Sequence, residues 1–369
     1  MGILLTAAVV LWILTRPVPL RWPAYLLPLA VFMAATLLSL AVSPNPGIGW
    51  RPVQKSVLFS MGVLSATFVT TESRRRAAYK LLLATASLAG IMAIAQFVLA
   101  ESTFFRTGLR ADDPTLVNRI TGPLGHWLTF SGVQLLVWCA AISALAFLGR
   151  KWIVPFSIVG MAIILSNTRG AWLGAAAGFA FVGWALPRRI LAMVLIPMIA
   201  ICIAASPFIY RRISMSLDAG LATNYCRVAY FVVGTRMIKD HPFFGVGPER
   251  IHDEFPNYYT GTELDKCYHG HLHSNVLQIA AERGLLCLAA FLWCLVELYR
   301  SLLRLLKRSD ENARWPILGS LAALTGFVVA GMTEFNFGDS EVLVLLLFLI
   351  SIPFGLASHV QENPDSQPR

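Results

Sequence analysis

Long apolar runs recur along the whole chain and are separated by short polar or proline-rich breaks. The runs are continuous and lack the alternation of apolar and polar residues that is typical of outer-membrane strands, so they predict helices. Several are shorter than the roughly 20 residues that cross a bilayer, and flanking Trp, Arg or Pro residues are expected to complete them. We predict about 11 transmembrane helices (10 to 12) at 3–15, 24–42, 56–71, 81–100, 127–149, 152–166, 171–186, 190–208, 274–306, 316–333 and 341–357.

Composition supports this interpretation. The 369 residues are 56% hydrophobic and only 14% charged, and the mean hydropathy is +0.64. One soluble core could not bury so much apolar surface, so the chain is predicted to be an all-α polytopic membrane protein. The first run follows no basic residue and precedes no small-residue cleavage site, which favours a retained helix over a signal peptide.

The net charge is +10, but the basic residues are distributed as in a membrane protein and do not indicate a nucleic-acid partner. Basic residues gather in every second loop, which is the positive-inside pattern. The pattern predicts an external N-terminus and a cytoplasmic tail. The polar loops on the far side of the membrane are then 43–55, 101–126, 167–170, 209–273 and 334–341.

The chain divides by these criteria into four segments. They are a helix bundle over 1–208, a long outer loop over 209–273, further membrane helices over 274–357 and a tail over 358–369. The outer loop has roughly 65 residues, too many for a bare linker, and is expected to carry its own structure. An amphipathic helix is predicted to begin with Asn224 as its N-cap and to end before Pro242, with Val228, Phe231, Val232 and Ile238 on its apolar face.

Two arginines are candidates for binding an anion on this outer side. Arg169 follows a very short loop at a predicted helix start that Asn167 or Thr168 can cap, where guanidinium and free backbone N–H groups suit a phosphate. The alternative is an arginine without an anionic ligand, whose side chain extends from the helix end to the membrane–water interface. Arg227 has no carboxylate within one helical turn, whereas Arg236 can pair with Asp240 four residues later, so Arg227 is the better candidate.

Three alternating histidines precede a long apolar helix. His269, His271 and His273 could chelate zinc with Glu263 or Asp265, but no characteristic metal spacing completes such a site, so no metal is predicted. His273 directly precedes the helix. The positive end of that helix and nearby arginines favour a neutral imidazole, which a general base requires.

Several further polar residues follow on the same outer side. Asn275, Gln278 and Glu282 fall on one helical stripe, which predicts a wet cavity; the alternative is the exposed first turns of a long helix. The segment "GMTEFNFGDSEV" (331–342) is expected at the cavity edge, where Glu334, Asp339 and Glu341 could instead balance the arginines. Cys226 and Cys267 share the outer loop, where they form a disulfide or remain free thiols.

Four segments, in this order, resemble the O-antigen ligase and polymerase superfamily: "TRGAWLG", Arg227 with "DHPFFGVGP", "HSNVLQIAAERG" and "GMTEFNFGDSEV". The resemblance implies a GT-C-type glycosyltransferase of the bacterial inner membrane with a periplasmic active site. It implies transfer of a glycan from undecaprenyl diphosphate, with inversion and without a metal or other cofactor. Arg169 and Arg227 would then bind the diphosphate and His273 would act as the base, with Asn275, Gln278, Glu282, Arg236 and His271 in support.

Several functions fit these residues. The leading one is ligation of O-antigen to a sugar of lipid A-core in lipopolysaccharide biosynthesis. A glycan polymerase or a protein O-oligosaccharyltransferase would share the donor chemistry and differ in the acceptor. A flippase for lipid-linked sugars would use the arginines but would tolerate the loss of His273.

Overall fold

The computed structural model describes Leu11 and residues 18–107, 119–216, 222–261, 267 and 270–356. Every regular element in these residues is helical, which confirms the predicted all-α class. The predicted helix 3–15, apart from Leu11, and the tail 358–369 lie outside the described residues. Packing divides the chain into two compact units: unit 1 comprises 1–71, 225–317 and 331–369, and unit 2 comprises 72–224 and 318–330.

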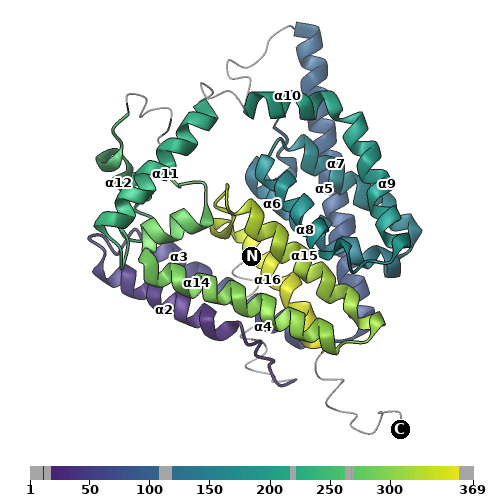
Figure 1. The fold of residues 1–369 in the computed structure, drawn as a ribbon, viewed down its shortest axis with the longest axis horizontal. Coiled ribbons are helices and arrows are strands. Elements are labelled where there is room, and N and C mark those ends of the chain that lie inside the picture. Colours follow the sequence, from purple (N-terminus) through teal and green to yellow (C-terminus); the bar gives the residue numbers. More distant parts are fainter. Residues whose placement is uncertain are drawn as a thin grey trace. The chain divides into compact units, whose positions relative to one another are not determined.

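Unit 1 is built around two helix pairs whose members are far apart in sequence (Figure 1). Helix α2 (Leu26–Val42) runs beside α14 (Asn275–Arg308), and α4 (Ser60–Phe68) packs against α16 (Ser340–Ser351). The Ser65 hydroxyl donates to the carbonyl of Phe348 (2.8 Å), which joins the second pair. The other elements assigned here are α3 (Trp50–Gln54), η1 (Lys55–Phe59), most of α11 (Ala222–Asp240), α12 (Ile251–Tyr258), η4 (Glu311–Ala313), η5 (Asn336–Gly338) and η6 (Ile352–Gly355).

Helix α14 is broken at Gly284, where the sequence predicted one continuous helix over 274–306. Gly284 has φ +83°, and a Cβ there would collide with the carbonyl of Phe243. The 242–247 turn satisfies backbone groups at the break: Val246 N donates to Ala281 O (2.9 Å) and Leu285 N donates to Pro242 O (2.8 Å). The segment "HPFFGVGP" therefore forms the backbone partner of the α14 break.

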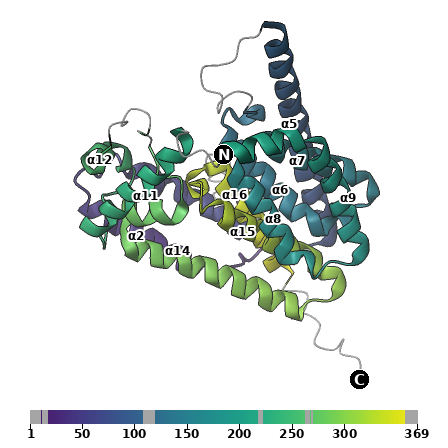
Figure 2. The ribbon, with the colours of Figure 1, turned by 45° about the horizontal axis from the view of Figure 1, so that its top comes forward.

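Unit 2 is a second helical bundle (Figure 2). Helix α6 (Trp127–Leu148) is almost wholly buried, and its Trp138 stacks on Phe156 with ring centroids 5.0 Å apart. Gly174 and Gly178 lie against the backbone of α15 (Arg314–Ala330), where a Cβ would meet the carbonyls of Gly326 and Ala322; small residues four apart permit such close packing in membranes. The other elements are α5 (Glu72–Thr107), η2 (Gly122–Leu124), η3 (Arg150–Trp152), α7 (Ile153–Leu165), α8 (Arg169–Gly183), α9 (Arg188–Ala204) and α10 (Ser206–Ser216).

The described helices include several candidate membrane spans, fewer than the expected eleven. Four helices are long and apolar enough to cross a bilayer: Glu72–Leu99, Trp127–Leu148, Asn275–Arg308 and Glu311–Ala330. A fifth is possible if Arg188–Ala204 and Ser206–Met215, bent by 71°, form one span. Other predicted spans fall on shorter apolar helices, such as α2 with 17 residues and α16 with 12.

Helix α5 begins earlier than the sequence indicated. Arg75 and Arg76 lie between the predicted helices 56–71 and 81–100, but they belong to α5, which starts at Glu72. The Glu72 carboxylate binds Arg75 (3.2 Å) and Arg76 (2.6 Å) one turn later, and such pairs stabilise a first helical turn. The basic cluster is therefore the start of the helix.

Candidate active site

A buried carboxylate connects two of the predicted site residues. Within unit 1, Arg227 Nη2 donates to Glu334 Oε1 (2.8 Å), and His273 Nδ1 lies 3.0 Å from Glu334 Oε2. The three side chains come from α11, from the turn before α14 and from the connection between α15 and α16. Glu334 is only 7% exposed, so the bridge is largely shielded from water.

The environment of Glu334 keeps its carboxyl ionised. Burial alone raises its pKa, but the hydrogen bond and charge of His273 and the guanidinium of Arg227 outweigh burial, so the pKa is lowered. An ionised carboxylate only accepts hydrogen bonds, so the facing Nδ1 of His273 carries a proton. In the neutral ring, Nε2 then carries the lone pair, and the carboxylate fixes this tautomer.

The backbone and neighbouring rings hold His273 in place. His273 has φ +49°, a left-handed conformation that is uncommon for a residue with a side chain and is found preferentially at functional sites. Its ring stacks on Tyr230 with centroids 5.2 Å apart, and the ring of His271 lies at 4.2 Å. Ser274 then starts α14 as its N-cap, because its hydroxyl accepts a hydrogen bond from Leu277 N (3.4 Å).

Two residues of the predicted polar stripe, Gln278 and Asn275, form hydrogen bonds with the segments that contain His273 and Glu334. Gln278 accepts a hydrogen bond from Leu272 N (2.7 Å), next to His273. Asn275 donates to Asn336 Oδ1 (2.6 Å) and accepts from Phe337 N (3.0 Å), close to Glu334. Both side chains are therefore placed to support the geometry of the site.

The stripe does not line a wet cavity, and it is not an exposed first turn. Asn275, Gln278 and Glu282 are 2–3% exposed and face the interior of unit 1. Glu282 accepts hydrogen bonds from Gln278 Nε2 (2.5 Å), Arg283 Nε (3.1 Å) and Glu249 N (3.2 Å). Buried polar groups need such partners, and here they come from α14 itself and from the turn that contains Glu249.

Arg169 belongs to unit 2 and begins α8 there. Its Nη2 donates to Asn224 Oδ1 (2.9 Å), and Asn224 in turn donates to the carbonyl of Met215 (3.1 Å). Asn224 therefore lies inside α11, which begins at Ala222, and is not the predicted N-cap. Thr168 occupies the N-cap position of α8, but its side chain makes no capping bond and instead donates to Ser166 O (3.3 Å).

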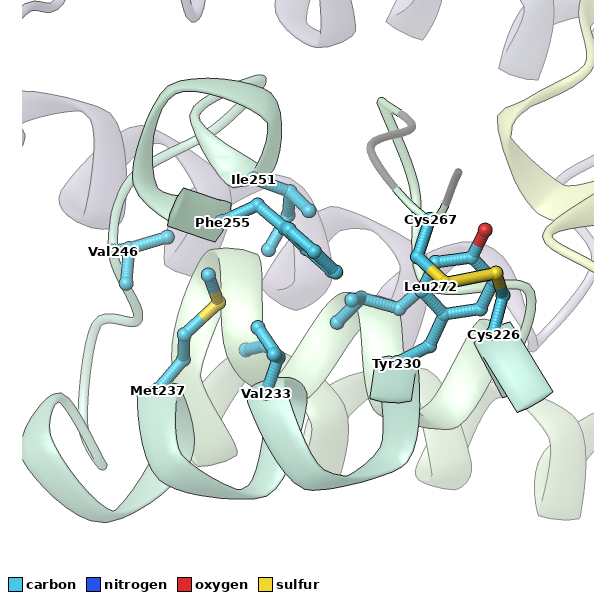
Figure 3. Close-up of a cluster of buried hydrophobic side chains, with 10 residues drawn as sticks. Cys226, Tyr230, Val233, Met237, Val246, Ile251, Phe255, Cys267 and Leu272 are labelled. Carbon is cyan, nitrogen blue, oxygen red and sulfur yellow. A yellow bond between two sulfur atoms is a disulfide. The ribbon is translucent and has the colours of Figure 1, made fainter. Parts of the chain in front are cut away.

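Two predictions about α11 are wrong. Arg236 donates to the carbonyl of Tyr258 (2.8 Å) and to Thr260 (3.2 Å), in place of the expected pair with Asp240. The predicted apolar face is also misplaced, because Val228, Phe231 and Val232 are exposed. The buried face is formed by Cys226, Tyr230, Val233 and Met237 (Figure 3).

A disulfide joins Cys226 to Cys267 at the edge of this buried cluster (Figure 3). Cys226 directly precedes Arg227, and Cys267 lies shortly before His271 and His273. The bond therefore links the two segments that supply the arginine and the histidine of the site. Of the two states left open by the sequence, the structure contains the paired cysteines.

Replacing Cys226 and Cys267 together by serine is expected to lower the free energy of unfolding by about 2–4 kcal/mol, because a cross-link over this loop restricts the unfolded chain. Melting of the purified protein and the rate of its reaction should both report the loss. Reductant should reproduce it in the wild type, and Cys202→Ser, at an exposed free thiol, is the matched control. Equal melting temperatures for the double variant and the control would contradict a stabilising role.

A second prediction concerns pH. The folded pKa of Glu334 lies below its unfolded value of about 4.3, so its stabilising contribution is fully present above that pH and is lost as the pH falls through the folded value. Glu334→Gln should therefore have a lower melting temperature than the wild type between about pH 7 and 5, and the difference should narrow below about pH 4. A difference in melting temperature that already vanishes at pH 6 would contradict a lowered pKa for Glu334.

Metal ligation has no support in the described part of the chain. No group of three or more His, Cys, Asp or Glu side chains is arranged there to hold a metal ion. His269, Glu263 and Asp265, the other members of the alternative zinc site, lie outside the described residues.

These features define the class: a helical membrane protein with an Arg–Glu–His arrangement in a loop region between apolar helices. Residues 154–292 match the family model of O-antigen ligase, which agrees with the resemblance seen in the first three sequence motifs and supports an O-antigen ligase family assignment. The match includes Arg169, Arg227 and His273. None of the curated proteins compared with the chain matches it.

Proposed function

We propose that the protein is a membrane glycosyltransferase that moves an O-antigen glycan from undecaprenyl diphosphate to a sugar hydroxyl of lipid A-core. The contacts of Glu334 with both Arg227 and His273 carry this proposal, because they combine a polarised base with a phosphate-binding side chain. The family match supports glycosyl transfer as the chemistry.

His273 is the proposed general base. Its Nδ1–H is held by Glu334, so Nε2 can take the proton of the acceptor hydroxyl as that oxygen attacks the anomeric carbon. Glu334 stabilises the imidazolium that forms, in the way that a buried carboxylate orients and supports a catalytic histidine. Burial raises the pKa of the Tyr230 hydroxyl, so the ring stacked on His273 stays uncharged.

Arg227 and Arg169 are the proposed diphosphate ligands. The side chain of Arg227 is 33% exposed and carries five N–H donors, of which one is engaged by Glu334. Arg169 stands at the N-terminus of α8, where the helix dipole also favours an anion. A guanidinium group in this role neutralises the charge that grows on the departing diphosphate, a part that a divalent ion plays in other enzymes.

The reaction balances without a cofactor. A bond forms between the acceptor oxygen and the anomeric carbon, and the bond from that carbon to the phosphate oxygen breaks with its electron pair. Attack from the opposite face inverts the anomeric configuration. The proton on His273 then passes to solvent or to the released diphosphate.

The remaining parts of the proposal are the membrane context and the fold. We place the protein in the bacterial inner membrane with a GT-C-type fold, the site on the periplasmic side and the C-terminus in the cytoplasm, in accord with the basic loops. The disulfide favours an oxidising compartment for the loop that contains it.

Reconstitution with an undecaprenyl diphosphate-linked glycan tests the function. Ligase activity predicts product on lipid A-core in the presence of a chelator. Product only on a second lipid-linked glycan would show a polymerase, and product only on protein would show an O-oligosaccharyltransferase. Movement of the donor between leaflets without any product would show a flippase, and inhibition by chelator would revive the histidine metal site.

A further inference from the structure

A cavity lined by both charged and apolar residues lies in unit 1 and belongs to no step of the proposed reaction. Its volume is about 350 Å³. It is enclosed by the end of α2, by the 240–246 turn and by α12. The residues that line it are Val42, Ser43, Pro44, Asp240, His241, Pro242, Phe243, Phe244, Gly245, Val246, Arg250 and Glu254.

Two buried polar atoms of this lining have no hydrogen-bond partner in the described part of the chain. They are Ser43 Oγ and Arg250 Nε. Ser43 is only 8% exposed, and a Cβ on Gly247 would contact both Ser43 and Arg250, so the two side chains meet at one glycine. Because such groups are costly to bury unpaired, a hydrogen-bond acceptor bound in the cavity would stabilise both.

The charges of the lining favour a zwitterion over a simple anion. Asp240 and Glu254 carry two negative charges, whereas Arg250 carries one positive charge. Arg250 already pairs with Glu254 one turn later on α12 and donates weakly to Val246 O (3.4 Å). A phosphate can accept from Arg250 Nε and Ser43 Oγ, and a primary ammonium can donate to the carboxylates.

One rim of the cavity is apolar and exposed. Phe243 is 64% exposed, and Val42 at the end of α2 is 59% exposed. The backbone bond from Leu285 to Pro242 brings the exposed Leu285 and Leu286 of α14 next to this rim. Since α14 is long and apolar enough to cross a bilayer, this rim continues a lipid-facing surface.

We propose that this cavity binds the headgroup of a phospholipid with a primary amine, such as phosphatidylethanolamine. The phosphate contacts Arg250 and Ser43, the ammonium contacts Asp240 and Glu254, and the acyl chains leave over Phe243 and Val42. A lipid bound there would contact the 242–247 turn and so would stabilise the pairing of this turn with the α14 break.

Native mass spectrometry of the full chain, delipidated in detergent and given equal amounts of phosphatidylethanolamine, phosphatidylcholine and phosphatidylglycerol, tests the site. We expect one retained phosphatidylethanolamine and about tenfold weaker retention of phosphatidylcholine, whose methylated amine cannot donate hydrogen bonds. Asp240→Asn should lower retention of phosphatidylethanolamine about tenfold. Asp253→Asn, an exposed residue of α12 outside the lining, is the matched control.

Ser43→Ala is a second variant that removes one phosphate contact without changing the charge, and it should also weaken retention. Equal retention of the three lipids, or no difference between Asp240→Asn and Asp253→Asn at equal melting temperature, would show only annular lipid and overturn the proposal. Lipid retention is measured without glycan donor, so its outcome is independent of glycosyl transfer.

Discussion

His273→Ala is expected to lower glycosyl transfer by about 10²- to 10⁴-fold, the usual contribution of a positioned general base. The imidazole accepts the acceptor's proton, and Arg227, the second partner of Glu334, is always charged and cannot take over that role. The assay is the initial rate of product formation in proteoliposomes at saturating donor.

His252→Ala is the matched control for this variant. His252 is an exposed histidine of α12 and lies outside both the proposed active site and the lipid cavity. Its replacement should leave the rate within about twofold of wild type. Substitutions of exposed residues away from the active site and the core usually have small effects. A flippase would show the wild-type rate of donor movement in both variants.

Glu334→Gln is expected to reduce kcat by about 10²- to 10⁴-fold, as a carboxylate-to-amide change behind a catalytic histidine does elsewhere. The amide can donate to His273 Nδ1 and so stabilise the tautomer with the proton on the reactive nitrogen. Arg227 would also lose its charged partner. Because Glu334 acts through other residues, kcat should fall more than KM for the acceptor rises.

Two further variants separate positioning from a general structural role. Glu334→Asp keeps the charge and should restore part of the rate at the pH where Glu334→Gln is inactive. Glu341→Gln, an exposed carboxylate in the first turn of α16, should leave kcat near wild type. Full activity of Glu334→Gln in a properly folded protein would show that Glu334 has no role in the mechanism.

Local sequence patterns predicted the individual elements better than the contacts between them. Continuous apolar runs predicted helices, and Pro242 with its glycines predicted the end of α11 at Asp240. Arg169, Arg227 and His273 were singled out because each stands at a helix start or in an outer loop. Glu334 was noted only as one of several carboxylates, since its partners are 61 and 107 positions away and no local spacing joins them.

The errors have physical causes in tertiary packing. The apolar face of α11 was misplaced because Val228, Phe231 and Val232 are as apolar as the buried Tyr230 and Val233, and only the partner surfaces decide between the two faces. The stripe of Asn275, Gln278 and Glu282 was correctly placed on one helical face. Its burial could not be predicted, because the loops that satisfy these side chains come from distant parts of the chain.

The break of α14 at Gly284 is only weakly indicated by the sequence. A single glycine within a long apolar helix is usually tolerated, and periodicity continues across it. The requirement for glycine arises from the close approach of Phe243, which is 41 residues earlier in the chain. Pairing between the "HPFFGVGP" turn and the "AERG" segment therefore appears only in the folded structure.

Donor affinity and turnover, measured on the same preparations of His273→Ala, Arg169→Ala and Arg227→Ala, test the central claim most directly. The predicted result is that both arginine variants bind undecaprenyl diphosphate-linked glycan about tenfold or more weakly. His273→Ala should instead bind the donor as the wild type does and yet form almost no product. Wild-type turnover without the imidazole, or donor affinity unchanged by the loss of either arginine, would contradict the account.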